Sequence, residues 1–130
     1  MKRALARAAY TNLLRLATPL YLARLWWRGR REPGYREAMA ERLGPRHGPA
    51  AARPVWVHAV SLGETHAASA LIGALRAARP GLRLLLTHGT ATGRAAGAPM
   101  LRPGDHQAWL PYDTPGAVRR FLKRHKPGLG

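Results

Sequence analysis

The sequence contains no cysteine among its 130 residues. Disulfide frameworks, thiolate zinc sites and cysteine nucleophiles are therefore excluded. Acidic residues are also scarce, because six Asp and Glu stand against 22 Lys and Arg, which gives a formal net charge of +16. Such a charge favours anionic partners such as nucleic acid, anionic lipid or a phosphorylated substrate, without choosing among them.

Residues 1–31 lack the long apolar run of a membrane-spanning helix, because Arg15 and Arg24 interrupt it and a span needs about 20 apolar residues. Apolar residues nevertheless recur at three- and four-residue steps on one helical face. They are Leu5, Ala9, Leu13, Leu16, Leu20 and Trp27. The pattern predicts an amphipathic helix, bent at Pro19, that associates with a membrane by lying in its interface. Three arginines follow Trp26 and Trp27. This combination is typical of an anchor at the headgroups of a cytoplasmic membrane face.

Two other interpretations of residues 1–31 stay open. A secretory signal would need a small-residue cleavage site after the apolar part, and none precedes Trp26. An ordinary helix packed on a globular domain would need no membrane at all.

The chain divides by its patterns into three parts: residues 1–31, 32–53 and 54–130. The middle part predicts a second short helix over 35–43 and a linker rich in Pro, Gly and Ala. The last part alternates between β-prone and helical patterns. Strands are expected at 55–60, 82–87 and 107–110, and helices at 65–79, from 94 onward and at 116–124.

This alternation predicts a Rossmann-like α/β fold with a parallel sheet and right-handed crossovers. Ligands of such sheets gather at the carboxyl ends of the strands, where residues 61–64 and 88–93 fall. A further strand is expected after residue 126. We therefore expect 54–130 to be an incomplete domain and the chain to be a fragment.

Ser61 and Glu64 have the spacing of a helix capping box, in which the carboxylate reaches back to the N-cap amide. A purely structural cap is one interpretation. The other is a general base, because the helix dipole favours a negative charge at that position and Gly63 lets a ligand approach the backbone closely. Ser61, Gly63 and Glu64 are therefore candidate site residues, with Glu64 as the proton acceptor.

The turn at residues 90–94 is a second candidate site. Thr90, Thr92, Gly93 and Arg94 offer hydroxyls, backbone amides and one cation to a phosphate or a sugar. The turn lacks the Gly-Lys-Ser/Thr of a P-loop, and an ordinary strand-to-helix turn is the alternative.

Metal and nucleic-acid sites find little support in the sequence. The six histidines show no metal-ligand spacing, so no metal is expected. Aromatic residues are not interleaved with basic ones as they are on single-strand binding platforms. Nucleic-acid binding would depend on charge alone and is not expected.

Residues 55–64 read VWVHAVSLGE, and LTHGTATG and LPYD follow at 86–93 and 110–113. In this order the motifs resemble those of the transferases of 3-deoxy-D-manno-octulosonic acid (Kdo), and the first is similar to the family signature WxHAxSxGE. Residues 86–93, LTHGTATG, are similar to its Thr-rich loop, although His88 and Gly89 stand where the family usually carries Thr or Ser. LPYD at 110–113 and ERLG at 41–44 also match family elements, so the resemblance covers nearly the whole chain.

The resemblance implies a GT-B glycosyltransferase, of which this chain is the N-terminal, acceptor-binding half. It implies transfer of Kdo from CMP-Kdo to the lipid A precursor (lipid IVA) in lipopolysaccharide biosynthesis, on the cytoplasmic side of the bacterial inner membrane. It also implies that Glu64 is the base and that no metal or other cofactor takes part. The donor-binding half and the family's ETExWPN segment are missing from the sequence, so the chain alone is expected to be inactive.

A function of another class remains as the alternative. A non-catalytic basic module could bind nucleic acid or an anionic membrane, with Ser61 and Glu64 serving only as a helix cap. It accounts for the charge but not for the ordered motifs.

Overall fold

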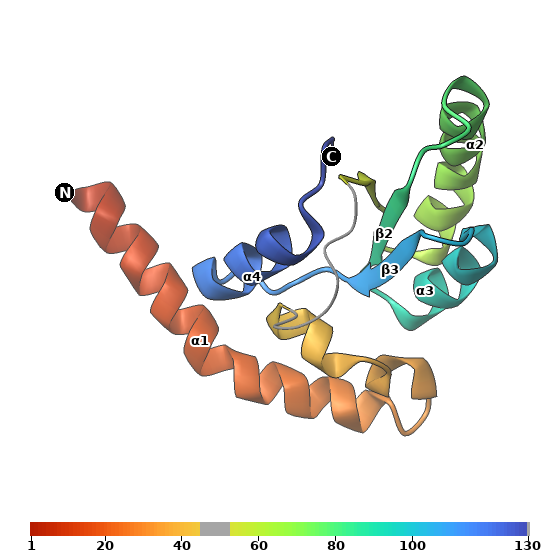
Figure 1. The fold of residues 1–130 in the computed structure, drawn as a ribbon. Helices are drawn as coiled ribbons and strands as arrows, with labels where there is room; N and C mark the ends of the chain where they lie inside the picture. The colour runs from red at the N-terminus through yellow and green to blue at the C-terminus, as the bar shows by residue number, and fades with distance from the viewer. Residues whose placement is uncertain (45–52, 130) are drawn as a thin grey trace.

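The computed structural model describes residues 1–44 and 53–129, and most of the predicted linker, at 45–52, lies outside the described residues. A long helix and two short 3-10 turns precede three strand–helix repeats (Figure 1). The elements are α1 (Lys2–Arg28), η1 (Pro33–Arg36), η2 (Met39–Leu43), β1 (Val55–His58), α2 (Leu62–Ala78), β2 (Leu84–His88), α3 (Ala91–Gly97), η3 (Ala98–Met100), β3 (His106–Trp109) and α4 (Pro115–His125).

The three strands form one parallel sheet in the order β1-β2-β3. Helices α2 and α3 lie on one side of it and α4 on the other (Figure 1). The predicted α/β class with a parallel sheet is thereby confirmed. Leu129 adds a parallel bridge to Val55, and the Trp56 amide donates to its carbonyl at 2.7 Å, so the outer edge of β1 is paired where the sequence predicts a further strand.

The core has two parts, one on each face of the sheet. Strand β2 is buried at every position, as expected for the central strand of a parallel sheet covered on both faces. Leu84 and Leu86 pack with Ile72 of α2, whereas Leu85, between them, packs with Phe121 of α4. The alternation of the strand thus divides one leucine run between two helical layers.

Helix α2 begins at Leu62 rather than 65, because the Ser61 side chain caps it by accepting from the Glu64 amide, and two other elements also differ from the prediction for local reasons. The short helix expected over 35–43 is instead the pair η1 and η2, because Ala38 between them takes a left-handed conformation with φ 46°. Helix α3 begins at Ala91 rather than 94, because the Thr90 side chain caps it by accepting from the Gly93 amide.

Helix α1 extends away from the sheet at its N-terminal end and changes direction along its length (Figure 1). Pro19 lies inside it and cannot donate the helical hydrogen bond, which is a recognised cause of such bends. Of the apolar face predicted from periodicity, Leu13, Leu16 and Leu20 are 66%, 76% and 75% exposed. Among the described helices, none is long and apolar enough to cross a membrane.

Candidate functional site

Glu64 lies in the first turn of α2, where Ser61 is the N-cap residue. The Glu64 amide donates to the Ser61 hydroxyl at 3.5 Å, and the carboxylate Oε2 accepts from the Val60 amide at 2.8 Å. The capping box therefore forms, but the carboxylate reaches the residue before the N-cap rather than the N-cap amide itself. The Glu64 side chain is exposed, and Oε1 makes no hydrogen bond within the described part of the chain, so this oxygen is available to accept a proton.

The start of α3 packs directly against the start of α2. The Val60 carbonyl accepts from the Gly89 amide at 3.0 Å, the Thr90 amide at 3.0 Å and the Thr90 hydroxyl at 3.1 Å. A Cβ built on Gly93 would lie 3.1 Å from the Ser61 carbonyl carbon. Two turns separated by almost thirty residues in sequence thus form one corner at the carboxyl ends of β1 and β2.

A buried polar network lies beneath this corner. His88, the last residue of β2, is fully buried, with Nδ1 3.0 Å from the Ala59 carbonyl and Nε2 3.0 Å from the Gln107 side-chain amide. These partners fix the neutral tautomer, in which Nδ1 donates and Nε2 accepts. Burial lowers the pKa of His88 to about 4, against the smaller opposing effect of the bond to Ala59. The Thr65 hydroxyl completes the network by donating to the Ser61 carbonyl at 2.8 Å.

Arg94 is turned toward the η2 segment. Its Nη1 lies 2.8 Å from Glu41 Oε2, and its guanidinium lies 4.9 Å from the centre of the Trp109 ring. The same Glu41 oxygen accepts from the Trp109 backbone amide at 2.9 Å. Glu41 therefore ties α3 to the outer edge of β3 and satisfies an edge amide that the sheet leaves open.

The neighbouring Arg42 is 3% exposed and lies over the Trp109 ring at 3.9 Å. Its carbonyl accepts from the Tyr112 amide at 2.8 Å, while its Nε and Nη2 have no hydrogen-bond partner among the described residues. Burial lowers the pKa of Arg42 and raises that of Tyr112. The ERLG and LPYD motifs thus pack against each other.

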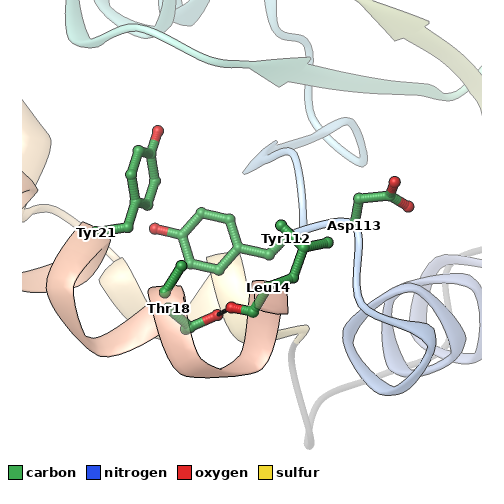
Figure 2. A pocket seen from close by; sticks show the side chains of 6 residues that line it. Leu14, Thr18, Tyr21, Tyr112 and Asp113 are labelled. Atoms are coloured by element: carbon green, nitrogen blue, oxygen red, sulfur yellow. Dashed lines mark hydrogen bonds between the residues drawn. The ribbon is translucent and has the colours of Figure 1, made fainter. Parts of the chain in front are cut away.

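A separate groove of about 240 Å³ lies between α1 and the residues that follow β3. Figure 2 shows Leu14, Thr18 and Tyr21 of α1 on one side and Tyr112 and Asp113 on the other. The Tyr21 and Tyr112 rings meet edge to face at 4.9 Å. None of the groove residues was a candidate from the sequence, so this is a contact between α1 and the domain rather than part of the predicted site.

The structure therefore brings most of the predicted site residues together. Ser61, Gly63 and Glu64 adjoin Thr90 and the residues after it, with Gly63 and Thr92 exposed. Arg94, by contrast, is held by Glu41. Within the described ranges, no group of three or more His, Asp or Glu side chains is placed to hold a metal ion.

Two residues that hold the site together, Val60 and Glu41, were not among the site residues predicted from the sequence. Val60 acts through its backbone, so its apolar side chain gives no signal. Glu41 was recognised only as part of a motif, and its partners, Arg94 and Trp109, lie more than fifty residues away in sequence.

Comparison with known proteins decides the family. Residues 37–130 match the model of the family described as "3-Deoxy-D-manno-octulosonic-acid transferase (kdotransferase)". The chain belongs to the Kdo transferase family. It matches the N-terminal domain of that family, which agrees with the resemblance of its motifs.

Three curated relatives of this chain carry the family's name, one of them as a probable member. A 3-deoxy-D-manno-octulosonic acid transferase of Bordetella pertussis is 50% identical over 135 residues, which cover 97% of this chain and 31% of the relative. The Haemophilus influenzae enzyme of that name is 32% identical over 95% of the chain and 29% of its own length. A probable mitochondrial one of Arabidopsis thaliana is 34% identical over 91% of the chain and 27% of its own length. The chain thus spans about a third of the length of these relatives, and no solved structure matches it.

Proposed function

We propose that this chain is the acceptor half of an enzyme that transfers Kdo from CMP-Kdo to the lipid A precursor. The observation that carries the proposal is the state of Glu64: one carboxylate oxygen is fixed by the Val60 amide at 2.8 Å, and the side chain is exposed at the carboxyl ends of the strands. A fixed, accessible carboxylate is suited to general-base catalysis. Membership of the family supplies the reaction.

In the proposed reaction, the acceptor hydroxyl oxygen attacks the anomeric carbon of Kdo and forms the new glycosidic bond. The bond from that carbon to the phosphate oxygen of CMP breaks, and CMP leaves with the bonding electrons. The hydroxyl proton moves to Glu64 Oε1. The donor would be bound by the other half of the enzyme, and the scheme uses no metal or cofactor.

We assign substrate contacts to the groups that surround Glu64. A Cβ built on Gly63 would meet no described atom within 4 Å, so the first turn of α2 is open to an acceptor. Ser61 and Thr92 offer hydroxyls beside it, and Thr90 and Gly93 shape the adjoining turn. For Arg94, a phosphate of the acceptor would have to compete with Glu41, which already lies 2.8 Å away.

Helix α1 supports attachment to the cytoplasmic surface of the inner membrane. Its exposed leucines form the apolar face, and its basic residues supply attraction to anionic headgroups. The Leu13→Ser/Leu16→Ser double variant should bind anionic phospholipid vesicles at least roughly tenfold more weakly. In the matched control, Leu71→Ser, an equally polar change is made at a 53% exposed leucine of α2. Equal binding by both variants in a sedimentation assay would rule out α1 as the anchor.

The test of the proposed base is Glu64→Gln in an active transferase that carries this chain. A glutamine side-chain oxygen can still accept from Val60, so the free energy of unfolding should fall by less than about 1 kcal/mol, the contribution of one charge in the first turn of a helix. It cannot take the acceptor proton, so kcat should fall by roughly 100-fold or more. Glu37→Gln, at an exposed carboxylate, is the control and should keep full activity. If folding and activity of Glu64→Gln fall together, the carboxylate is only a helix cap.

A further inference from the structure

The backbone of Val60 connects Glu64 to the start of α3. Its N–H donates to Glu64 Oε2 at 2.8 Å, while its carbonyl accepts three hydrogen bonds, from the Gly89 amide and from the amide and hydroxyl of Thr90. Val60 is 40% exposed, so little packing besides the contact of its side chain with Gly89 fixes this residue. Its position, and with it that of the Glu64 carboxylate, is set by hydrogen bonds from the turn before α3.

Thr90 uses its hydroxyl fully in this arrangement. The single proton goes to the Val60 carbonyl at 3.1 Å, and the oxygen accepts from the Gly93 amide at 3.2 Å and lies 3.4 Å from the Thr92 hydroxyl. A hydroxyl has one proton to donate and two lone pairs. The Thr90 hydroxyl therefore has no donor left for a substrate, and its geometry fits a role that acts through Val60.

Gly93 holds the other side of the same corner. A Cβ at this position would lie 3.1 Å from the carbonyl carbon and 3.2 Å from the carbonyl oxygen of Ser61, so a larger residue would push the two backbones apart by a few tenths of an ångström. The Ser61 carbonyl also accepts from the Thr65 hydroxyl at 2.8 Å. The residues on both sides of the Val60–Ser61 peptide bond are thus held before any substrate arrives.

We propose that Thr90 is a positioning residue for Glu64: through the Val60 backbone it holds Oε2 in place and leaves Oε1 directed to the acceptor hydroxyl. This rests on the proposed function, in which Glu64 is the base. Preorganisation of this kind matters because a displacement of about 1 Å can reduce a rate roughly 100-fold. The threonine contributes to the rate without touching the substrate.

The first experiment measures the link from Thr90 to Glu64 in the 130-residue chain, by NMR. At pH 7, the Val60 amide proton of the wild-type chain should resonate downfield of its position in Glu64→Ala, which removes the carboxylate acceptor, and this shift difference, measured in each Thr90 background, is the Val60 response. Thr90→Ser keeps the hydroxyl and should behave as the wild type, whereas Thr90→Val should lose most of the response. Thr114→Val is the matched control, because Thr114 is the N-cap of α4 and makes no side-chain cap bond.

A second variant separates the helix cap from the link to Val60. Thr90→Asp keeps a side-chain acceptor for the Gly93 amide, as a good N-cap residue does, but a carboxylate cannot donate to the Val60 carbonyl. It should fold even if Thr90→Val does not, and it should also lose the Val60 response. A Val60 response that persists in folded Thr90→Asp or Thr90→Val overturns the positioning role, whatever the activity.

Kinetics of an active transferase that carries the chain complete the test. Thr90→Val and Thr90→Asp should lower kcat roughly 10- to 100-fold with KM for the acceptor nearly unchanged, and Thr90→Ser should restore kcat. A rise in KM at constant kcat would show a substrate contact instead and overturn the inference. An active Glu64→Gln enzyme would overturn the proposed function itself, whereas the NMR response tests only the position of the carboxylate.

Discussion

Lowering the pH from 7 to 5 is expected to destabilise this domain through two buried histidines. Burial lowers the pKa of His88 to about 4, and burial, helped by the charge of Arg124, lowers that of His125 to about 4. Both are nearly or fully buried, at 0% and 7% exposure. In the unfolded chain each should titrate near the ordinary value of about 6.5.

The sign follows from proton binding. Between about pH 6.5 and 4 the unfolded chain holds more protons than the folded one, so stability is fully present above pH 6.5 and is lost as the pH falls. With these two values, each histidine costs about 2 kcal/mol by pH 5 and about 3 kcal/mol by pH 4. The two together should remove about 4 kcal/mol by pH 5, a large part of the 5 to 15 kcal/mol of an ordinary domain.

Urea denaturation from pH 7.5 to 5, followed by tryptophan fluorescence, to which the buried Trp109 contributes, measures this loss. His88→Asn keeps a donor for the Ala59 carbonyl but cannot be protonated, so its loss of stability over that range should be about half that of the wild type. His66→Asn is the control, because His66 is exposed on α2 and its replacement should leave the slope unchanged. Stability that is flat from pH 7 to 5, or a full slope in His88→Asn, would refute the burial argument.

Two further predictions concern the acids that join distant segments. Glu41→Ala should lose about 1 to 3 kcal/mol of unfolding free energy, because it leaves the buried Trp109 amide without a partner and releases Arg94. Urea denaturation at pH 7 measures this loss, and a value below about 0.5 kcal/mol would show that the bond to Trp109 is dispensable. Asp105→Ala should lose about 3 to 5 kcal/mol of unfolding free energy, because its carboxylate is the buried partner of Arg76 in α2 and a charge left alone in the interior is costly. The control is Glu32→Ala, which breaks an exposed ion pair. It should cost less than about 1 kcal/mol in the same assay.

Local chemistry made the core of the domain predictable from sequence. The run at Leu84–Leu86 is apolar, short and bounded by turn residues, so it predicts a buried strand. The capping box of Ser61 indicates a helix start, although the predicted helix began at 65, three residues after the observed start of α2 at Leu62. The alternation of strand and helix patterns also predicted that the turns after β1 and β2 lie at the same end of the sheet, because it predicted parallel strands. The predicted site is therefore mostly a consequence of topology.

The rest could not be predicted, because it depends on contacts between segments far apart in sequence. The expected helix over 35–43 breaks into η1 and η2 at Ala38, and in this arrangement the Glu37 carbonyl accepts from the Trp109 indole N–H at 2.7 Å. Helix propensity does not include such a distant contact. The burial of His88 was missed for a similar reason, since its partners come from a different strand and from the residues after β1.

The motifs that connect this chain to its family lie around one corner of the sheet, and each contributes differently to the position of Glu64. The first motif supplies Glu64 and the Val60 backbone that holds it. The Thr-rich turn supplies the hydrogen bonds that hold Val60, and Gly93 allows the close approach. The ERLG motif lies farther out, where Glu41 joins α3 to β3 and so fixes the element that carries Thr90. A substitution at Glu41 should therefore weaken the placement of Glu64 without touching it, and the Val60 amide response in Glu41→Gln should fall between those of the wild type and Thr90→Val. An unchanged Val60 response in Glu41→Gln would show that Thr90 holds Glu64 independently of the sheet edge.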